Sequence, residues 1–214
     1  MIRTGILLLA ALVVALPSIA QTSTPPTAVP PSLNLPASQG IIAKLDTDLD
    51  ASRNKPGDLV QAETTRELKV GHDVLLKKGS VLTGHVTQVQ TYSNAYPSMI
   101  VIVFDQVAPK GGSPATLNVK IQALAPAPTV STDSLQDGRG MAATQINSAV
   151  AGADKSVGGG GELMATSVGV YGMRGMSLAS SVHDQKLYSA VQSNIGDVKL
   201  KKGAQLVFKA PEQQ

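Results

Sequence analysis

A ten-residue phrase occurs twice in this chain and limits its possible folds more than any other feature. The first copy is Asp73-Val-Leu-Leu-Lys-Lys-Gly-Ser-Val-Leu82 and the second is Asp197-Val-Lys-Leu-Lys-Lys-Gly-Ala-Gln-Leu206, identical at seven of ten positions. Each copy is typical of a β-strand, a tight Lys-Lys-Gly turn and a second strand, because glycine adopts the left-handed conformation that closes such turns. The repeat predicts a small β-barrel in which the two turns occupy comparable corners.

Residues 1–20 have the composition of a signal peptide. Arg3 gives a short positive start, residues 5–16 are an unbroken apolar run, and small residues at Ser18 and Ala20 suit cleavage after Ala20. The run is shorter than the roughly 20 residues that cross a bilayer, so we expect cleavage, with retention as an inner-membrane anchor as the alternative. We expect no integral membrane span after cleavage.

The cysteine count points to a compartment. The chain has no cysteine, which excludes a lipid-modified cysteine anchor and any disulfide. An exported protein without disulfides fits the bacterial periplasm, the cell surface or a secreted state better than a eukaryotic secreted domain. We therefore expect a bacterial envelope protein.

Composition also divides the mature chain. Residues 21–39 are rich in Pro, Ser and Thr and predict an extended tether. Residues 126–164 are rich in Gly and Ala and carry too little apolar area to fold, so they predict a flexible low-complexity insertion. The alternative is one weak helix over Ala142–Ala153. The barrel itself is expected over residues 40–125 and 165–210, before a tail at residues 211–214.

The apolar patterns within these two ranges predict an all-β, sandwich-like barrel of roughly seven to nine short strands, with at most one short helix besides the signal peptide. Glu67–Leu76 is expected to be one strand, bent near Gly71. Order is expected at Met176–Ala179, whereas His183-Asp184 lies in a polar, mobile stretch. The remaining expected strands are Gly40–Leu45, Asp58–Thr65, Ser80–Gln90, Met99–Phe104, Ala115–Ala123 and a closing hairpin of Asp197–Leu200 with Gln205–Ala210.

Catalytic chemistry has little support in the sequence. A Gly-x-Ser-x-Gly elbow is absent, and the spaced glycines of Gly169–Gly175 lack the strand-to-helix setting of a phosphate loop. The three histidines, His72, His85 and His183, have no zinc spacing. We therefore expect no catalytic residue, no cofactor and no enzymatic activity.

Two ion-binding patterns are weak. Asp46-Thr-Asp48-Leu-Asp50 begins like a calcium loop, but Ala51 stands where the loop needs glycine and Gly57 where it needs glutamate, which favours a solvated turn. The lysine doublets of the repeat could form an anion-binding rim, although exposed lysines that protect strand edges are the favoured reading. We therefore expect no metal site.

The scarcity of aromatic residues excludes some partners. With no Trp, two Phe and four Tyr, the chain lacks the stacking platforms of proteins that bind single-stranded nucleic acid or sugars. The expected partners are other envelope proteins or a second copy of the chain, and not nucleic acid.

The stretch Gly40–Ala123 resembles the β-barrel domain of TrbI-like proteins. The resemblance rests on an entry strand, the turn Pro56-Gly57, the hairpin Leu75-Leu-Lys-Lys-Gly79-Ser80 with Gly84 after it, and the closing turn at Gly203. Lys77 replaces the family's turn proline and Ala204 its usual threonine, and residues 126–164 lack the amphipathic helices that this family inserts.

The resemblance implies a β-barrel and a place among scaffold proteins that link the two membranes in bacterial conjugation and type IV secretion. The leading hypothesis is an exported, non-enzymatic structural or interaction module of the cell envelope. The alternatives are a secreted protein that binds a small molecule or glycan, and a working scaffold subunit of a secretion or conjugation channel.

Overall fold

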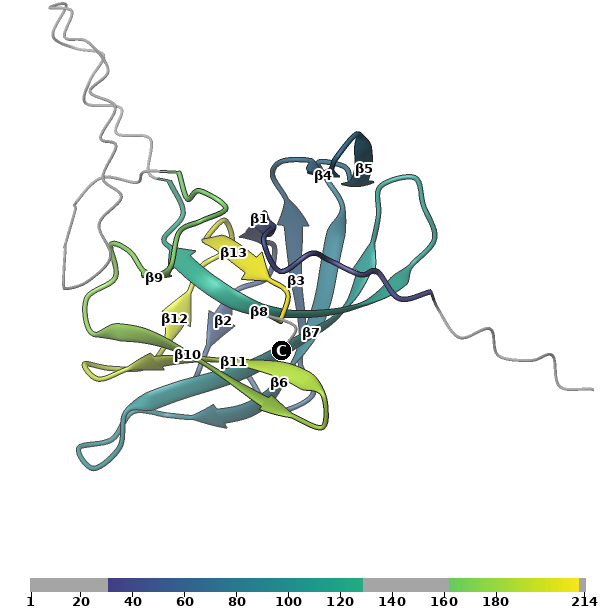
Figure 1. The fold of residues 1–214 in the computed structure, drawn as a ribbon. Helices are drawn as coiled ribbons and strands as arrows, with labels where there is room; N and C mark the ends of the chain where they lie inside the picture. The colour runs from purple at the N-terminus through teal and green to yellow at the C-terminus, as the bar shows by residue number, and fades with distance from the viewer. Residues whose placement is uncertain (1–30, 129–161, 212–214) are drawn as a thin grey trace, which may run out of the picture.

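The computed structural model describes residues 31–128 and 162–211, and in these ranges every regular element is a β-strand (Figure 1). The predicted signal peptide, most of the predicted tether and insertion, and the possible helix at Ala142–Ala153 lie outside the described residues. The strands are β1 (Gly40–Leu45), β2 (Leu49–Asp50), β3 (Leu59–Thr64), β4 (Leu68–Val70), β5 (Asp73–Leu76), β6 (Val81–Gln90), β7 (Ser98–Ala108), β8 (Ala115–Ala125), β9 (Gly169–Val170), β10 (Met176–His183), β11 (Lys186–Ser193), β12 (Lys199–Leu200) and β13 (Gln205–Lys209).

Six strands close a barrel, which confirms the predicted all-β fold. The large sheet runs β10-β11-β7-β6-β3-β1-β13-β8-β9. An additional pairing of β7 with β8 closes the six strands from β7 to β8 into a ring. The pairs within the ring are antiparallel. Two short pairs, β2 with β12 and β4 with β5, stand outside this sheet.

The repeated phrase forms equivalent corners, as predicted, but neither copy is a hairpin. After the first turn β6 pairs with β3 while β5 pairs with β4, and after the second turn β13 pairs with β1 while β12 pairs with β2. Gly79 and Gly203 have φ angles of 84° and 92°, as the turns require. The pairing register shifts at the same position after each turn, at Thr83/Gly84 in β6 and Val207/Phe208 in β13, where the partner strands β7 and β8 each carry one extra residue. The barrel therefore consists of two related halves, one formed by β3, β6 and β7 and the other by β1, β13 and β8.

The core is aliphatic and centred on the only two phenylalanines. The rings of Phe104 and Phe208 lie 4.7 Å apart in an edge-to-face arrangement, one from each half of the barrel. Buried Leu, Ile and Val side chains from both halves surround them. The inward-facing positions of β6, among them Leu82 and Val86, alternate with more exposed ones as the sequence pattern predicted.

Two predicted strand assignments differ from the structure. Glu67–Leu76 is a small hairpin of β4 and β5, because Gly71 has a φ of 62° and reverses the chain. The stretch around His183-Asp184 is the turn of the β10–β11 hairpin, where Asp184 and Gln185 take φ angles of 49° and 61°. The strand β10 was underestimated because its small Ser and Ala residues give a weak hydrophobic pattern.

Contacts with the barrel extend beyond its predicted boundaries. On the N-terminal side, the main-chain N–H of Leu33 donates to the carbonyl of Thr116 at 2.8 Å, and Leu33 packs against the core. On the other side, the Leu163 side chain is buried beside Ala123 and Val207. Leu33 and Leu163 thus belong to the packed barrel, although the composition of the segments around them predicted a tether and a flexible insertion.

Candidate functional site

The two ends of the large sheet differ sharply. One end is β9, a strand of two residues, and the other is β10, a strand of eight. β10 pairs with β11 over eight consecutive residues without a bulge, and among the described residues no strand pairs with its other side. The hairpin lies beneath β8 in Figure 1. A long, regular edge of this kind is a template for another strand.

β10 also lacks the features that usually protect an edge strand. Its sequence, Met-Ser-Leu-Ala-Ser-Ser-Val-His, contains no Lys, Arg, Asp, Glu or Pro. Natural edges are commonly blocked by such residues, by bulges or by shortness. Val182 is 68% exposed on this strand. The edge is therefore uncharged, free of bulges and unpaired among the described residues.

The hydrogen-bond pattern shows which groups are available. Asn194 donates its main-chain N–H to the Gly175 carbonyl at 3.0 Å, just before β10 begins. Bonded and non-bonded pairs alternate in an antiparallel ladder, so the odd-numbered residues of β10 bond to β11. The N–H and C=O groups of Leu178, Ser180 and Val182 point away from β11, and no hydrogen-bond partner for them occurs in residues 31–128 and 162–211.

Side-chain contacts fix the hairpin against the barrel. The Ser189 hydroxyl accepts the main-chain N–H of Ile121 at 2.8 Å, and the Asn118 side chain bonds to both Gln185 and Leu187 at the start of β11. Met176 and Leu178 pack against the core. The hairpin is thus held on its inner face, and nothing in residues 31–128 and 162–211 pairs with the edge of β10.

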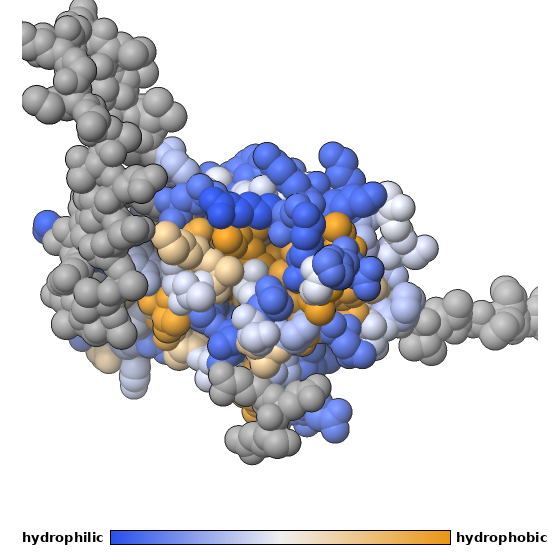
Figure 2. Space-filling view, turned by 45° about the horizontal axis from the view of Figure 1, so that its top comes forward, coloured by the Kyte–Doolittle hydropathy of each residue, from blue (hydrophilic) through white to orange (hydrophobic). Residues whose placement is uncertain are grey.

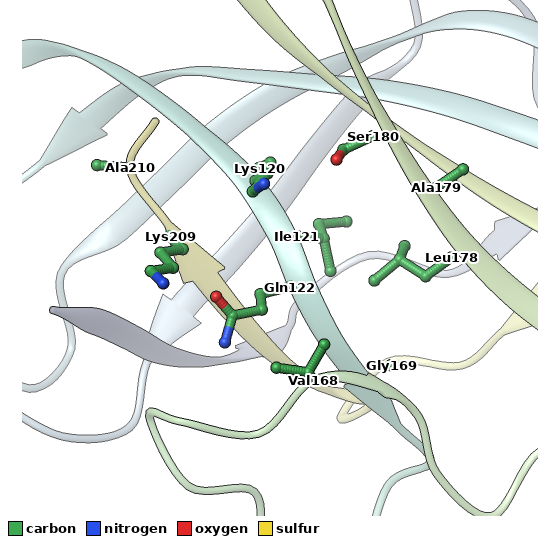
Figure 3. Close-up of a pocket in the computed structure, with 10 residues that line it drawn as sticks. All are labelled: Lys120, Ile121, Gln122, Val168, Gly169, Leu178, Ala179, Ser180, Lys209 and Ala210. Atoms are coloured by element: carbon green, nitrogen blue, oxygen red, sulfur yellow. The ribbon is translucent and has the colours of Figure 1, made fainter. Parts of the chain in front are cut away.

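A shallow cleft of about 240 Å³ lies beside this edge. In the close-up, Leu178 on β10 and Ile121 on β8 point toward each other, while Val168 and Gly169 border one end and Lys209 lies beyond β8 (Figure 3). Drug-sized ligands usually occupy pockets of roughly 300–1,000 Å³. The cleft is smaller than that, so it does not favour an enclosed drug-sized ligand.

The exposed apolar surface is divided. Figure 2 shows hydrophobic side chains in the middle of one face, interrupted and bordered by hydrophilic ones. Large apolar residues that are mostly exposed include Leu59 on β3, Val182 on β10 and Val168 beside the cleft. Scattered residues of this kind are ordinary, so the strand edge and not a broad apolar patch distinguishes this surface.

The aspartates of the calcium-like segment bind lysines of the second repeat. Asp46 lies 2.7 Å from the Lys202 ammonium, and Asp48 accepts the main-chain N–H of Lys202 at 2.7 Å. The Lys202 side chain lowers the pKa of Asp46, and the Lys202 main-chain N–H lowers the pKa of Asp48. Asp50 accepts two hydrogen bonds from Ser52, which lower its pKa.

These contacts argue against both ion-binding patterns. The carboxylates are taken by neighbouring donors, and no group of three acidic or histidine residues in the described ranges could hold a metal. Lys201 and Lys202 form ion pairs with Asp48 and Asp46, which leaves this doublet less available to an anion. The segment stabilises a barrel corner.

The three histidines lie on different elements. His72 is in the β4–β5 turn, His85 on β6 lies 3.9 Å from Asp105, and His183 at the end of β10 lies 3.2 Å from Asp184. Lys186 also approaches Asp105, at 3.8 Å. Each histidine therefore has its own surroundings, and the structure does not assemble them.

Sequence reasoning missed one catalytic spacing. Ser52-Arg-Asn-Lys55 has the Ser-x-x-Lys spacing of some acyl-transfer enzymes, which position both residues on one helix. Here the segment is a turn, and the Ser52 hydroxyl donates to Asp50 at 2.6 Å. The Ser-x-x-Lys spacing was visible in the sequence, but the turn does not place the two side chains on one helical face as those enzymes do.

No helix in the described ranges is long and apolar enough to cross a membrane. Comparisons with protein-family models, curated proteins and solved structures find no match for this chain.

Proposed function

We propose that this chain is an exported, non-enzymatic interaction module of the bacterial cell envelope that binds a partner by adding a strand to β10. The observation that carries the proposal is the unprotected edge, with the outward-pointing groups of Leu178, Ser180 and Val182. In this mode main-chain hydrogen bonds supply affinity and alternate side chains supply specificity. The signal-like residues 1–20 and the absence of cysteine support the envelope.

The other functions receive less support. A small-molecule or glycan binder needs a deeper pocket than the 240 Å³ cleft and more aromatic residues than this chain has. A scaffold subunit of a type IV secretion or conjugation channel agrees with the resemblance to TrbI-like barrels, and a conjugation gene cluster beside the gene would favour it. It stays an alternative within the same class of interaction proteins.

Site-specific photo-crosslinking in a bacterial envelope tests the proposal. A photoreactive amino acid at Val182 should crosslink to a partner protein, whereas the same residue at Leu59, also exposed but on β3, should not. Ser180→Pro should abolish the Val182 crosslink, because proline removes an edge N–H that β11 does not use. Equal crosslinking from both positions, or a crosslink unchanged by Ser180→Pro, would contradict binding at this edge.

A further inference from the structure

We infer that the strand that pairs with β10 is β10 of a second copy, running antiparallel about a two-fold axis through Ser180. The inference rests on the proposed edge-binding function and names its partner. A two-fold pair uses the same surface on both copies, so the strand must be complementary to its own reverse. The residues of β10 meet this condition in hydrogen bonding, in side-chain packing and in charge.

The hydrogen-bond condition follows from the alternation along β10. Ser180 directs its N–H and C=O groups toward the open side, as do Leu178 and Val182. A two-fold axis at Ser180 makes the two Ser180 residues a directly bonded pair, and it pairs Leu178 with Val182 of the second copy in the same way. Three of the four outward-facing residues of β10 thereby gain partners, and the fourth, Met176, lies opposite the turn residue Asp184 of the second copy.

The packing condition concerns the inner face of the strand. Leu178 packs against the barrel core, whereas Val182, four residues along the same face, is 68% exposed. Residues opposite each other in an antiparallel pair share a face, so the second copy places its Leu178 beside Val182. The exposed Val182 of each copy is then covered by Leu178 of the other copy.

Charge also permits the pairing. His183 is the only ionisable residue of β10, and the same register places it opposite Ser177 of the second copy. No like charges meet directly, which would oppose a self-pairing. One strand pair is smaller than the roughly 1,200–2,000 Å² of a stable complex, so we expect a concentration-dependent dimer.

Single cysteines test the register, because the chain has no cysteine of its own. In the proposed pair the two Ser180 Cα atoms lie about 5.5 Å apart, which is within disulfide range. Full-chain Ser180→Cys should therefore give a covalent dimer on mild oxidation. Ser177→Cys is the matched control from the same exposed strand, since its two copies would lie about 20 Å apart.

Sedimentation of the full chain from low to high micromolar concentration gives the second measurement. Val182→Lys should weaken dimerisation about tenfold or more, because the charge would enter the strand pair. Leu59→Lys should leave dimerisation unchanged, with unaltered circular dichroism showing that both variants fold. A monomer at every concentration, or equal crosslinking of Ser177→Cys and Ser180→Cys, would overturn the inference. If the Val182 photo-crosslink to another protein persists in that case, the proposed edge function stands without self-pairing.

Discussion

Gly79 donates its main-chain N–H to the carbonyl oxygen of Thr64 at 2.9 Å. The second repeat contains the same relationship, in which Gly203 donates to Leu45 at 2.7 Å. Thr64 and Leu45 in turn donate to the residue that follows each glycine, Ser80 or Ala204. The repeated phrase thus fastens a tight turn to the end of a neighbouring strand in each half of the barrel.

Gly79→Val should destabilise the protein by about 1–3 kcal/mol, because a β-branched residue is strained at the positive φ of this turn. The new side chain would also press on Lys110. Urea denaturation measures the loss. Gly196→Val is the matched control, since Gly196 lacks a positive φ and has open space for a Cβ atom. Equal stabilities of the two variants would contradict the turn assignment.

Gly84 is required for a different reason, which is the close approach of β6 and β7 at the bulge in β7. A Cβ atom at Gly84 would lie 2.2 Å from the Val103 carbonyl oxygen, which belongs to the main chain and cannot move aside cheaply. Gly84→Ala should therefore cost about 1–3 kcal/mol of folding free energy. Thermal unfolding should place its midpoint well below that of Gly196→Ala. A midpoint equal to the control's would show that the bulge relaxes freely.

Leu163→Ala should lower the free energy of unfolding by about 2–3 kcal/mol, because the side chain is buried against Ala123 and Val207. The adjacent Met164 is 57% exposed, so Met164→Ala should change stability by less than about 0.5 kcal/mol. Chemical denaturation of both variants compares them. Similar small effects would mean that residue 163 does not belong to the core. The predicted mobility of residues 126–164 stays a prediction for the part outside the described residues.

Acid should weaken the corner at Asp48. Hydrogen bonding to the Lys202 main chain lowers the pKa of Asp48 below the ordinary value of 3.8, so its contribution is present above that value and is lost as pH falls through the folded-state pKa. Asp48→Asn should reduce the stability difference between pH 6 and pH 3, measured by urea denaturation. Because the group is exposed, high salt should weaken the charge-dependent part of the effect. An unchanged pH profile in Asp48→Asn would assign the acid sensitivity to other groups.

The repeat predicted equivalent barrel corners because a glycine at a tight turn is a local requirement, expressed in consecutive residues. It also suggested hairpins, which was wrong, because the two strands of each copy pair with different neighbours. Strand pairing depends on closure of the whole ring, and no local pattern encodes it. The same limit hid β10, whose small side chains gave little periodic signal.

The sequence by itself determined the all-β class, the turn glycines Gly79 and Gly203, and the aliphatic core, because turn conformation and alternating hydrophobicity act over a few residues. Only the tertiary structure decided that the Asp46–Asp50 carboxylates bind donors instead of converging on one centre, since Lys202 lies far away along the chain. It also decided that β10 ends the sheet. An edge is defined by which strands are next to it, and that follows from the order in which distant segments pack.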